Sequence, residues 1–241
     1  MRHAFLLVLP ALTAFAQDAD LPARLARIKR LDVEGLKQVQ ASLAVAPGTP
    51  EQKAYFEALI GYELVAQTRG KDPKGAEALL DRVLKNLEGR KEAESMALRG
   101  ACLGLKIGFQ PMAGIHLAPE AENLFVDALR LSPGNPRVLL FRGVHVLHTP
   151  AFFGGGAERA MPLIQAALKA AEAEAAPSDP WAPRWGKAES LAWLAMAQSD
   201  AGQAEAARKS VDAALALDPS FAFAKFVLKT KVEAAASKAV H

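Results

Sequence analysis

The 241-residue chain has few of the residues from which β-sheets and disulfide-stabilised folds are built. Its one cysteine, Cys102, excludes an internal disulfide. It has only two tyrosines and no alternating β-branched run between tight turns, which disfavours sandwiches, barrels and doubly wound sheets. No uninterrupted apolar stretch reaches about 18 residues, so we expect no membrane-spanning helix.

The chain is instead rich in alanine and leucine, the two strongest apolar helix formers. They occupy 50 and 32 of the 241 positions, about a third of the chain. With 51% hydrophobic and 23% charged residues, the composition is typical of a globular protein rather than a disordered one. The sequence therefore predicts an all-α protein.

The N-terminus has the three parts of a secretory signal peptide. A short basic start, residues 1–3, precedes a mainly apolar run over residues 4–14, and Ala14-Phe15-Ala16 is a small-x-small cleavage site. We expect cleavage after Ala16, with an uncleaved N-terminal anchor as the alternative. No cysteine follows the site to carry a lipid. The mature chain is predicted to be periplasmic or secreted, with no membrane span after cleavage.

The chain also lacks an excess of charge of one sign. It has 29 Lys and Arg against 26 Asp and Glu, and both signs are interspersed. The densest cluster of one sign, Arg24, Arg27, Lys29 and Arg30, is interpreted as a solvated helix face. Because no longer basic stripe with interleaved aromatic residues exists, we expect no nucleic-acid partner.

An internal repeat organises the C-terminal half. Residues 188–221 form a 34-residue unit with small residues at Ala195, Ala207 and Ala214 and a closing Pro219. This unit resembles a tetratricopeptide repeat (TPR), in which small residues let two antiparallel helices approach closely. We therefore expect Ala207 and Ala214 to be buried at a helix contact.

The second-helix pattern, small-x3-large-x2-small, recurs three times upstream. It appears as Ala121/Phe125/Ala128, Ala160/Ile164/Ala167 and, more loosely, Ala76/Leu80/Val83, and the small residues of the preceding helices are then Gly100, Gly143 and Gly61. We measured each unit from the small residue of its first helix to the first alanine of its second-helix pattern. By this measure the three earlier units are 3, 9 and 5 residues longer than the last. Insertions at equivalent turns should lie along one edge of the array.

The predicted fold is an α-solenoid of about four TPR-like helix pairs with extended inner turns and a C-terminal capping helix. The domains are a signal peptide (1–16), an N-terminal helical segment (17–49) that begins with Asp20 as N-cap, the repeat array (50–221) and the capping helix (222–241). Residues 174–183 are the expected exposed connector. The paired helices are expected at 50–69 and 73–88, 91–109 and 119–131, 136–148 and 157–173, and 187–201 and 203–217, followed by a last helix at 220–237.

A second pattern spans roughly residues 118–200. Asn135-Pro136-Arg137, Thr149-Pro150, the turn 153–156 (Phe-Gly-Gly-Gly), Pro162 and Trp185-Gly186 resemble a largely uncharacterised family of exported bacterial TPR proteins. The resemblance implies a periplasmic or secreted helical-repeat protein, and it implies no reaction.

Residues with reactive side chains form no catalytic or metal-binding pattern. Cys102 lies among small residues and is interpreted as a buried, inert thiol. His145 and His148 share a helix face but lack a third ligand, so we expect packed or solvated histidines and no metal. The glycines at 154–156 either hold an anion at a helix start or allow backbone angles that tuck Phe152 and Phe153 into the core, and we favour the second interpretation. No cofactor is expected.

Three functions follow from these patterns. The leading hypothesis is a scaffold that binds a protein or peptide on its concave face or inserted turns. The alternative is a small-molecule-binding accessory protein of a periplasmic solute transporter, and an enzyme is disfavoured because no catalytic constellation exists. The expected binding residues, among which Trp185 is expected to be partly exposed, are Arg137, Leu140, Val144, His148, Phe152, Phe153, Trp185 and Met196.

Overall fold

The computed structural model describes the backbone of residues 21–238 and the side chains of residues 21–234. The expected signal peptide, residues 1–16, and the expected N-cap Asp20 lie outside the described residues. Over residues 21–238 every regular element is a helix and none is a strand, which confirms the all-α prediction. In this range no helix is long and apolar enough to cross a membrane.

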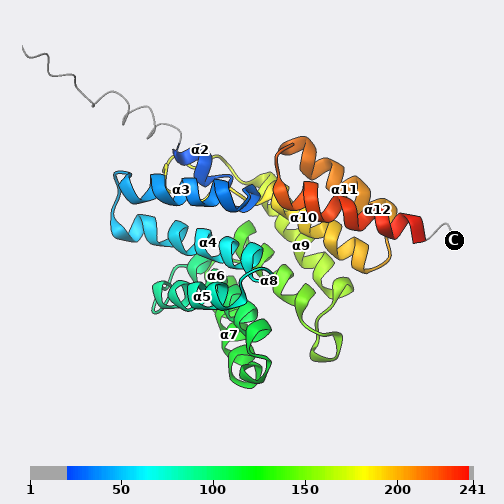
Figure 1. The fold of residues 1–241 in the computed structure, drawn as a ribbon, viewed down its shortest axis with the longest axis horizontal. Coiled ribbons are helices and arrows are strands. Elements are labelled where there is room, and N and C mark those ends of the chain that lie inside the picture. The colour runs from blue at the N-terminus through cyan, green and yellow to red at the C-terminus, as the bar shows by residue number, and fades with distance from the viewer. Residues whose placement is uncertain (1–20, 239–241) are drawn as a thin grey trace, which may run out of the picture.

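The chain folds as a series of helices joined by short turns (Figure 1). The N-terminal segment contains α2 (Leu21–Leu25), the 3₁₀ turn η1 (Ile28–Arg30) and α3 (Val33–Val45). Then follow α4 (Pro50–Thr68), α5 (Pro73–Asn86), α6 (Ala93–Phe109), the 3₁₀ turn η2 (Pro111–Ala113), α7 (Gly114–Leu131), α8 (Pro136–His148), the 3₁₀ turn η3 (Ala151–Phe153), α9 (Ala157–Ala173), α10 (Lys187–Asp200), α11 (Ala204–Leu217), the π-helical turn η4 (Ala224–Leu228) and α12 (Lys229–Lys238).

The predicted ends of the paired helices are confirmed to within two residues, except at the start of α7. Side-chain caps explain several starts: Thr49 forms a capping box with Gln52, and the Asp72 carboxylate accepts the Gly75 amide. Helix α7 was expected at residues 119–131. It begins five residues earlier because η2 leads directly into it, and Pro119 lies inside the helix.

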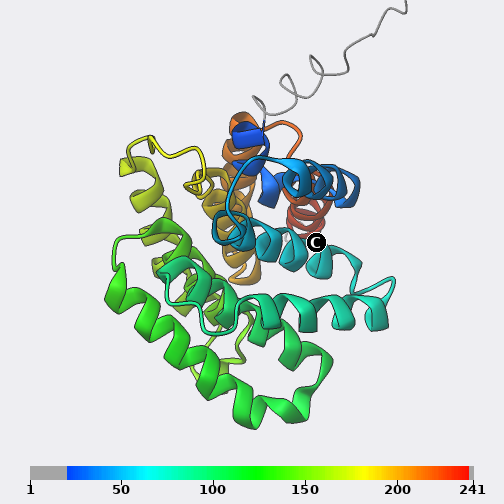
Figure 2. The ribbon, with the colours of Figure 1, turned by 90° about the vertical axis from the view of Figure 1, so that its left-hand side faces the viewer.

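Consecutive helices pack as hairpins, α4 with α5, α6 with α7, α8 with α9 and α10 with α11. The hairpins contact one another through α4 and α6, α6 and α8, and α9 and α10. Figure 1 shows α8 and α9 between α4–α7 on one side and α10–α12 on the other, and Figure 2 shows the N-terminal segment beside the C-terminal helices.

The repeated small-large-small pattern lies at the contact within each hairpin. All twelve residues of the four second-helix patterns are buried, including Ala207 and Ala214 as expected. The glycines of the first helices face them: a Cβ on Gly143 would lie 2.7 Å from Ile164 Cγ1, and one on Gly61 would lie 2.4 Å from Val83 Cγ2. The helices therefore approach so closely that a larger side chain has no room.

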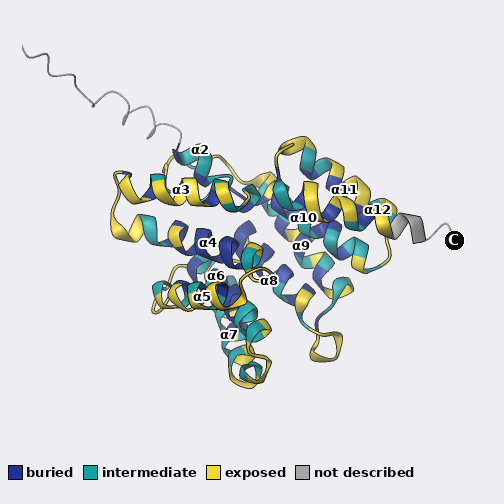
Figure 3. Cartoon of the chain, viewed as in Figure 1, coloured by how far each residue is buried: buried dark blue, intermediate teal, exposed yellow. Residues whose placement is uncertain are grey.

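The buried residues form two hydrophobic clusters (Figure 3). The larger one runs from α2 to α10, while a smaller one joins α10 and α11 to η4 and α12. Phe221 contributes to the smaller cluster, but Phe226 and Val227 at the start of the last helical segment are exposed. The C-terminal helices thus have a core largely of their own.

Replacement of Ala207 or Ala214 by leucine should overpack the α10–α11 contact and lower the free energy of unfolding by about 1–3 kcal/mol. Ala216→Leu, at an exposed position of α11, is the matched control and should leave stability nearly unchanged. Urea denaturation of the three variants measures the effect. Equal stability of all three would contradict the close approach of these helices.

Candidate functional site

A buried arginine joins helices that are far apart in sequence. Arg137, near the start of α8, is 5% exposed, and its Nε donates to Glu94 Oε1 at 2.7 Å. Its Nη1 donates to Glu174 Oε2 at 2.7 Å and to the Trp185 carbonyl at 3.2 Å. Burial alone would lower the pKa of Arg137, but its bonds with Glu174 and Glu94 raise it, so the guanidinium stays charged.

Asn135 positions this arginine. Its Oδ1 accepts the amides of Arg137 and Val138 and so caps α8, while its Nδ2 donates to Glu94 Oε1 at 2.8 Å. The Asn-Pro-Arg and Trp-Gly parts of the sequence pattern therefore meet around one ion-pair network, which we call the Arg137 network: Glu94, Asn135, Arg137, Glu174 and Trp185.

A pocket of about 340 Å³ lies against the Arg137 network. Its aromatic walls are Tyr55 and Phe56 from α4 and Trp181 from the connector between α9 and α10. The Phe56 and Trp181 ring centroids are 6.4 Å apart. We call it the Trp181 pocket, and its lining residues are Glu51, Gln52, Tyr55, Phe56, Arg90, Glu92, Ala93, Glu94, Ser95, Ser132, Asn135, Asp179, Trp181 and Pro183.

Trp181 takes this place because Gly48 has no side chain. A Cβ on Gly48 would lie 2.3 Å from Trp181 Cζ2, so the indole packs directly on the backbone of the α3–α4 turn. The Asp179 carboxylate accepts the Trp181 amide at 2.9 Å and fixes the connector at this point. The expected exposed connector is confirmed as non-helical, but its tryptophan is half-buried.

Beneath the pocket, three buried polar atoms lack a hydrogen bond of normal geometry: Tyr55 Oη, Glu94 Oε2 and Trp185 Nε1. Burial and the neighbouring Glu94 carboxylate raise the pKa of Tyr55 well above its ordinary value, so the phenol is neutral. The Tyr55 hydroxyl interacts with both Glu94 and Trp185, so the three polar groups are partners of one another. This region combines an aromatic wall with a buried cluster of polar groups.

A second, more open pocket of about 540 Å³ lies on the other side of Asn135. It runs between the start of α8 and the end of α9, and alanines form much of its wall. It has neither an aromatic residue nor a buried polar atom without a partner. Its lining residues are Gly134, Asn135, Pro136, Leu139, Ala166, Lys169, Ala170, Ala173 and Glu174.

The cationic cluster of the N-terminal segment is not the solvated face that was expected, because Lys29 is buried and Arg24, Arg27 and Arg30 are half-buried. Lys29 Nζ pairs with Glu63 of α4 and lies 5.0–5.1 Å from the ring centroids of Tyr62, Phe141 and Trp185. Such an ammonium is held by opposite charge and by the ring quadrupoles. The signal that sequence reasoning missed is Ile28, an apolar residue between the cations, which is fully buried.

Two neighbouring arginines bind the C-terminal helices. The Arg27 guanidinium donates to both Asp218 oxygens, at 2.9 and 3.1 Å, and Arg30 Nε donates to Glu189 Oε1 at 2.6 Å. Glu189 in turn accepts the Gly186 amide at the start of α10. Burial of Asp218 opposes ionisation, but its bonds with Arg27 and Ser220 lower its pKa to about 2. The segment Arg27–Arg30 thus bridges α4, α8 and α10, and we call it the cationic bridge.

Four of the expected binding residues are buried, and the structure explains why. Leu140 and Val144 belong to the main core, Arg137 lies in its ion-pair network, and Trp185, expected to be partly exposed, is 1% exposed over Lys29. These four residues are therefore part of the interior and do not form an open binding surface.

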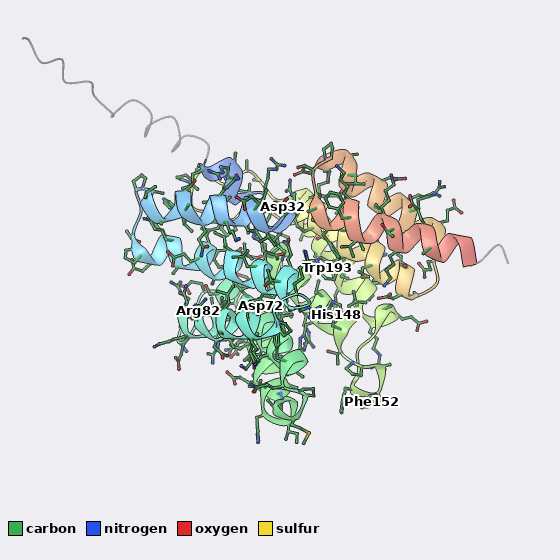
Figure 4. The ribbon with its side chains drawn as sticks, in the orientation of Figure 1. Asp32, Asp72, Arg82, His148, Phe152 and Trp193 are labelled. Carbon is green, nitrogen blue, oxygen red and sulfur yellow. The ribbon has the colours of Figure 1, made fainter. Side chains whose placement is uncertain are left out.

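The other four expected binding residues lie in two separate places. Figure 4 labels one residue of each place, His148 and Phe152. His148 packs edge-on against Trp193 of α10, with ring centroids 5.6 Å apart, and Met196 Sδ lies 3.1 Å from Lys231 Nζ. Partial burial and the Arg69 charge lower the pKa of His148. Phe152 projects from the α8–α9 turn, away from His148 and Trp193 (Figure 4), and Phe153 of the same turn is also exposed.

The glycine turn has the backbone conformation that was expected, but not the expected aromatic packing. Gly154 and Gly156 have positive φ angles of 89° and 103°, and a Cβ on Gly155 would lie 2.0 Å from the Thr149 carbonyl oxygen. The interpretation that Phe152 and Phe153 tuck into the core is wrong, since both are exposed.

Within the described residues no group of three or more His, Cys, Asp or Glu side chains could hold a metal ion. His145 stacks near Phe125, and burial lowers its pKa to about 4. Cys102 is fully buried, and burial raises the pKa of its thiol, as expected for an inert cysteine.

The depressed pKa of Asp218 predicts a loss of stability in acid. Because its folded pKa is about 2 and its unfolded value is about 3.9, its contribution is complete above about pH 4 and falls away towards pH 2. Asp218→Asn should be less stable than the parent at pH 5, and the difference should shrink between pH 4 and pH 2. Urea midpoints measured over this range test it, with the exposed Asp212→Asn as control. A difference that does not change with pH would be inconsistent with the ion pair.

Comparison with known proteins gives one informative likeness. No family model matches the chain, and no curated protein matches it. Among solved structures it is similar to the HusA haemophore from Porphyromonas gingivalis, with a TM-score of 0.58 and 22% sequence identity over 79% of this chain and 96% of that one. At this identity the likeness shows a shared all-helical fold.

Proposed function

We propose that this chain is an exported protein of TPR-like helix pairs that binds a small molecule in the Trp181 pocket. The observation that carries the proposal is the pocket itself, in which three aromatic side chains face polar groups above a buried ion-pair network. Ligand sites generally combine an apolar wall with a few placed polar groups in this way. The structural neighbour is named a haemophore, which is consistent with ligand binding outside the cytoplasm.

We favour a small-molecule ligand over a peptide bound on the concave face, which the first helix of each pair was expected to line. That face is covered where Lys29 and Ile28 pack against α4, α8 and Trp185. A peptide docked there would have to displace a buried ion pair, which costs several kcal/mol when one partner is left uncompensated. The scaffold hypothesis would therefore need another surface. We propose binding and no catalysis, since no nucleophile–base pair accompanies the pocket.

The charge of the lining favours a particular ligand class. Glu51, Glu92, Glu94 and Asp179 supply four carboxylates against the one guanidinium of Arg90, a formal net charge of −3. The whole chain, in contrast, has a net charge of +3. Aromatic rings and carboxylates together recognise organic cations. We therefore infer that the ligand is a small organic amine, smaller and of opposite charge to a haem with its carboxylates.

The test is a ligand screen on the purified protein. Native mass spectrometry of protein from an envelope fraction should show a co-purifying small molecule, and thermal-shift assays should rank a panel of organic amines above haemin. Trp181→Ala should weaken binding of the best amine by about 5- to 30-fold, since an aromatic contact to a cation contributes about 1–2 kcal/mol. Trp193→Ala is the matched control, because Trp193 lies on α10 outside the pocket.

Unchanged amine affinity in Trp181→Ala would exclude this pocket. Binding of haemin without binding of any amine would contradict the inferred ligand class. Because both tryptophan variants remove a partly buried indole, their far-UV circular dichroism and melting temperatures separate loss of the ligand from loss of the fold.

A further inference from the structure

One arginine holds both ends of the connector between α9 and α10. Arg137 Nη1 donates to the Glu174 carboxylate at 2.7 Å and to the Trp185 carbonyl at 3.2 Å. The two ends of the connector therefore lie beside each other, and the chain between them forms a loop, drawn in yellow in Figure 2. Compact surface loops whose ends meet in this way are Ω-loops, and they are frequently functional.

The middle of this loop, residues 177–184, is bonded to itself, and we call it the strap. The Ala182 amide donates to the Asp179 carbonyl at 3.1 Å, and Arg184 Nη2 donates to the carbonyls of Pro177 and Asp179, at 3.2 and 3.3 Å. In the part of the chain whose side chains the structure describes, each hydrogen bond of the strap has both partners inside it. Its three prolines also restrict the backbone. The strap is therefore a stiff unit.

The strap reaches the main hydrophobic cluster through the indole of Trp181, its one aromatic side chain. The ring packs on the backbone of Gly48, and its centroid lies 6.4 Å from that of Phe56. This contact is apolar and depends on the shape of the two surfaces. A unit joined to its neighbours by so little buried area opens at a lower free energy than the packed helices around it.

We propose that the strap is a movable wall of the Trp181 pocket and that Gly48 is the residue that positions it. The inference rests on the proposed function, because it assigns the control of binding at the same site. The strap supplies three of the lining residues, Asp179, Trp181 and Pro183. When Trp181 is docked on Gly48 the wall is complete and holds the amine, and when the strap turns outward on its ends at Arg137 the amine enters or leaves.

Gly48→Ala separates the position of Trp181 from its presence. The new Cβ would lie 2.3 Å from Trp181 Cζ2, so the indole has to move, although Gly48 itself does not line the pocket. The best amine should bind at least about fivefold more weakly and leave faster, because the cation loses its contact with the ring. Gly70→Ala is the matched control, since a Cβ on Gly70 would meet nothing within 4 Å. In a Trp181→Ala background, Gly48→Ala should not change the affinity further, because no indole remains to be displaced.

Fluorine NMR follows the strap in the protein without ligand. The chain has three tryptophans, so labelling with 5-fluorotryptophan gives three resonances, and Trp181→Ala identifies the one from the strap. We expect relaxation dispersion at Trp181 and none at Trp185, which is fully buried. The Trp181 resonance should move towards its solvent-exposed position in Gly48→Ala, and addition of the amine to the parent should remove the dispersion.

A Trp181 resonance that shows no dispersion and does not respond to Gly48→Ala would overturn the proposal, as would equal amine affinity of the parent and Gly48→Ala. Failure of the proposed function has a different signature. If the parent binds no amine, the control of binding is wrong as well, while the fluorine spectra still show whether the strap moves. Circular dichroism of Gly48→Ala and Gly70→Ala checks that both variants keep the helical content of the parent.

Discussion

The contact on which the rest of the structure depends is the cationic bridge, Arg27–Arg30. The C-terminal helices have a hydrophobic cluster largely of their own, so apolar packing alone joins them to the main core through little more than α10. The bridge adds Arg27 to Asp218 and Arg30 to Glu189, while Lys29 is held between Glu63 and three aromatic rings of the main core. The Lys29–Glu63 and Arg30–Glu189 pairs are largely removed from water, so loss of either partner would leave the other charge uncompensated.

The cationic bridge also supports the Trp181 pocket, the proposed ligand site. Its buried lysine lies under Trp185, whose backbone carbonyl accepts from Arg137, and the Arg137 network in turn forms the support of the Trp181 pocket. The face of the first helices is therefore part of the core at its centre, and the Trp181 pocket remains open beside α4 and the connector.

The fold could be predicted from the sequence because the packing pattern is local and repeated. The spacing of Ala207, Val211 and Ala214, and its upstream copies, gave the helix limits and the buried face, since an α-helix returns small and large residues to the same side at fixed intervals. The candidate site could not be predicted in this way. It depends on contacts of high sequence separation, such as Arg137 with Glu94 and Trp181 with Gly48. A charged side chain in isolation indicates solvent, because burial requires a partner that the local sequence does not show.

The central claim, that the cationic bridge attaches the C-terminal helices to the main core, is tested most directly by native-state hydrogen exchange. In Arg27→Ala with Arg30→Ala, the amides of α11 and α12 should lose protection by at least about tenfold more than those of α4 and α6, since the C-terminal helices then open as a separate unit. Lys37→Ala with Lys74→Ala removes two exposed cations as a control. An equal loss of protection in all helices, or no loss in α11 and α12, would contradict the account.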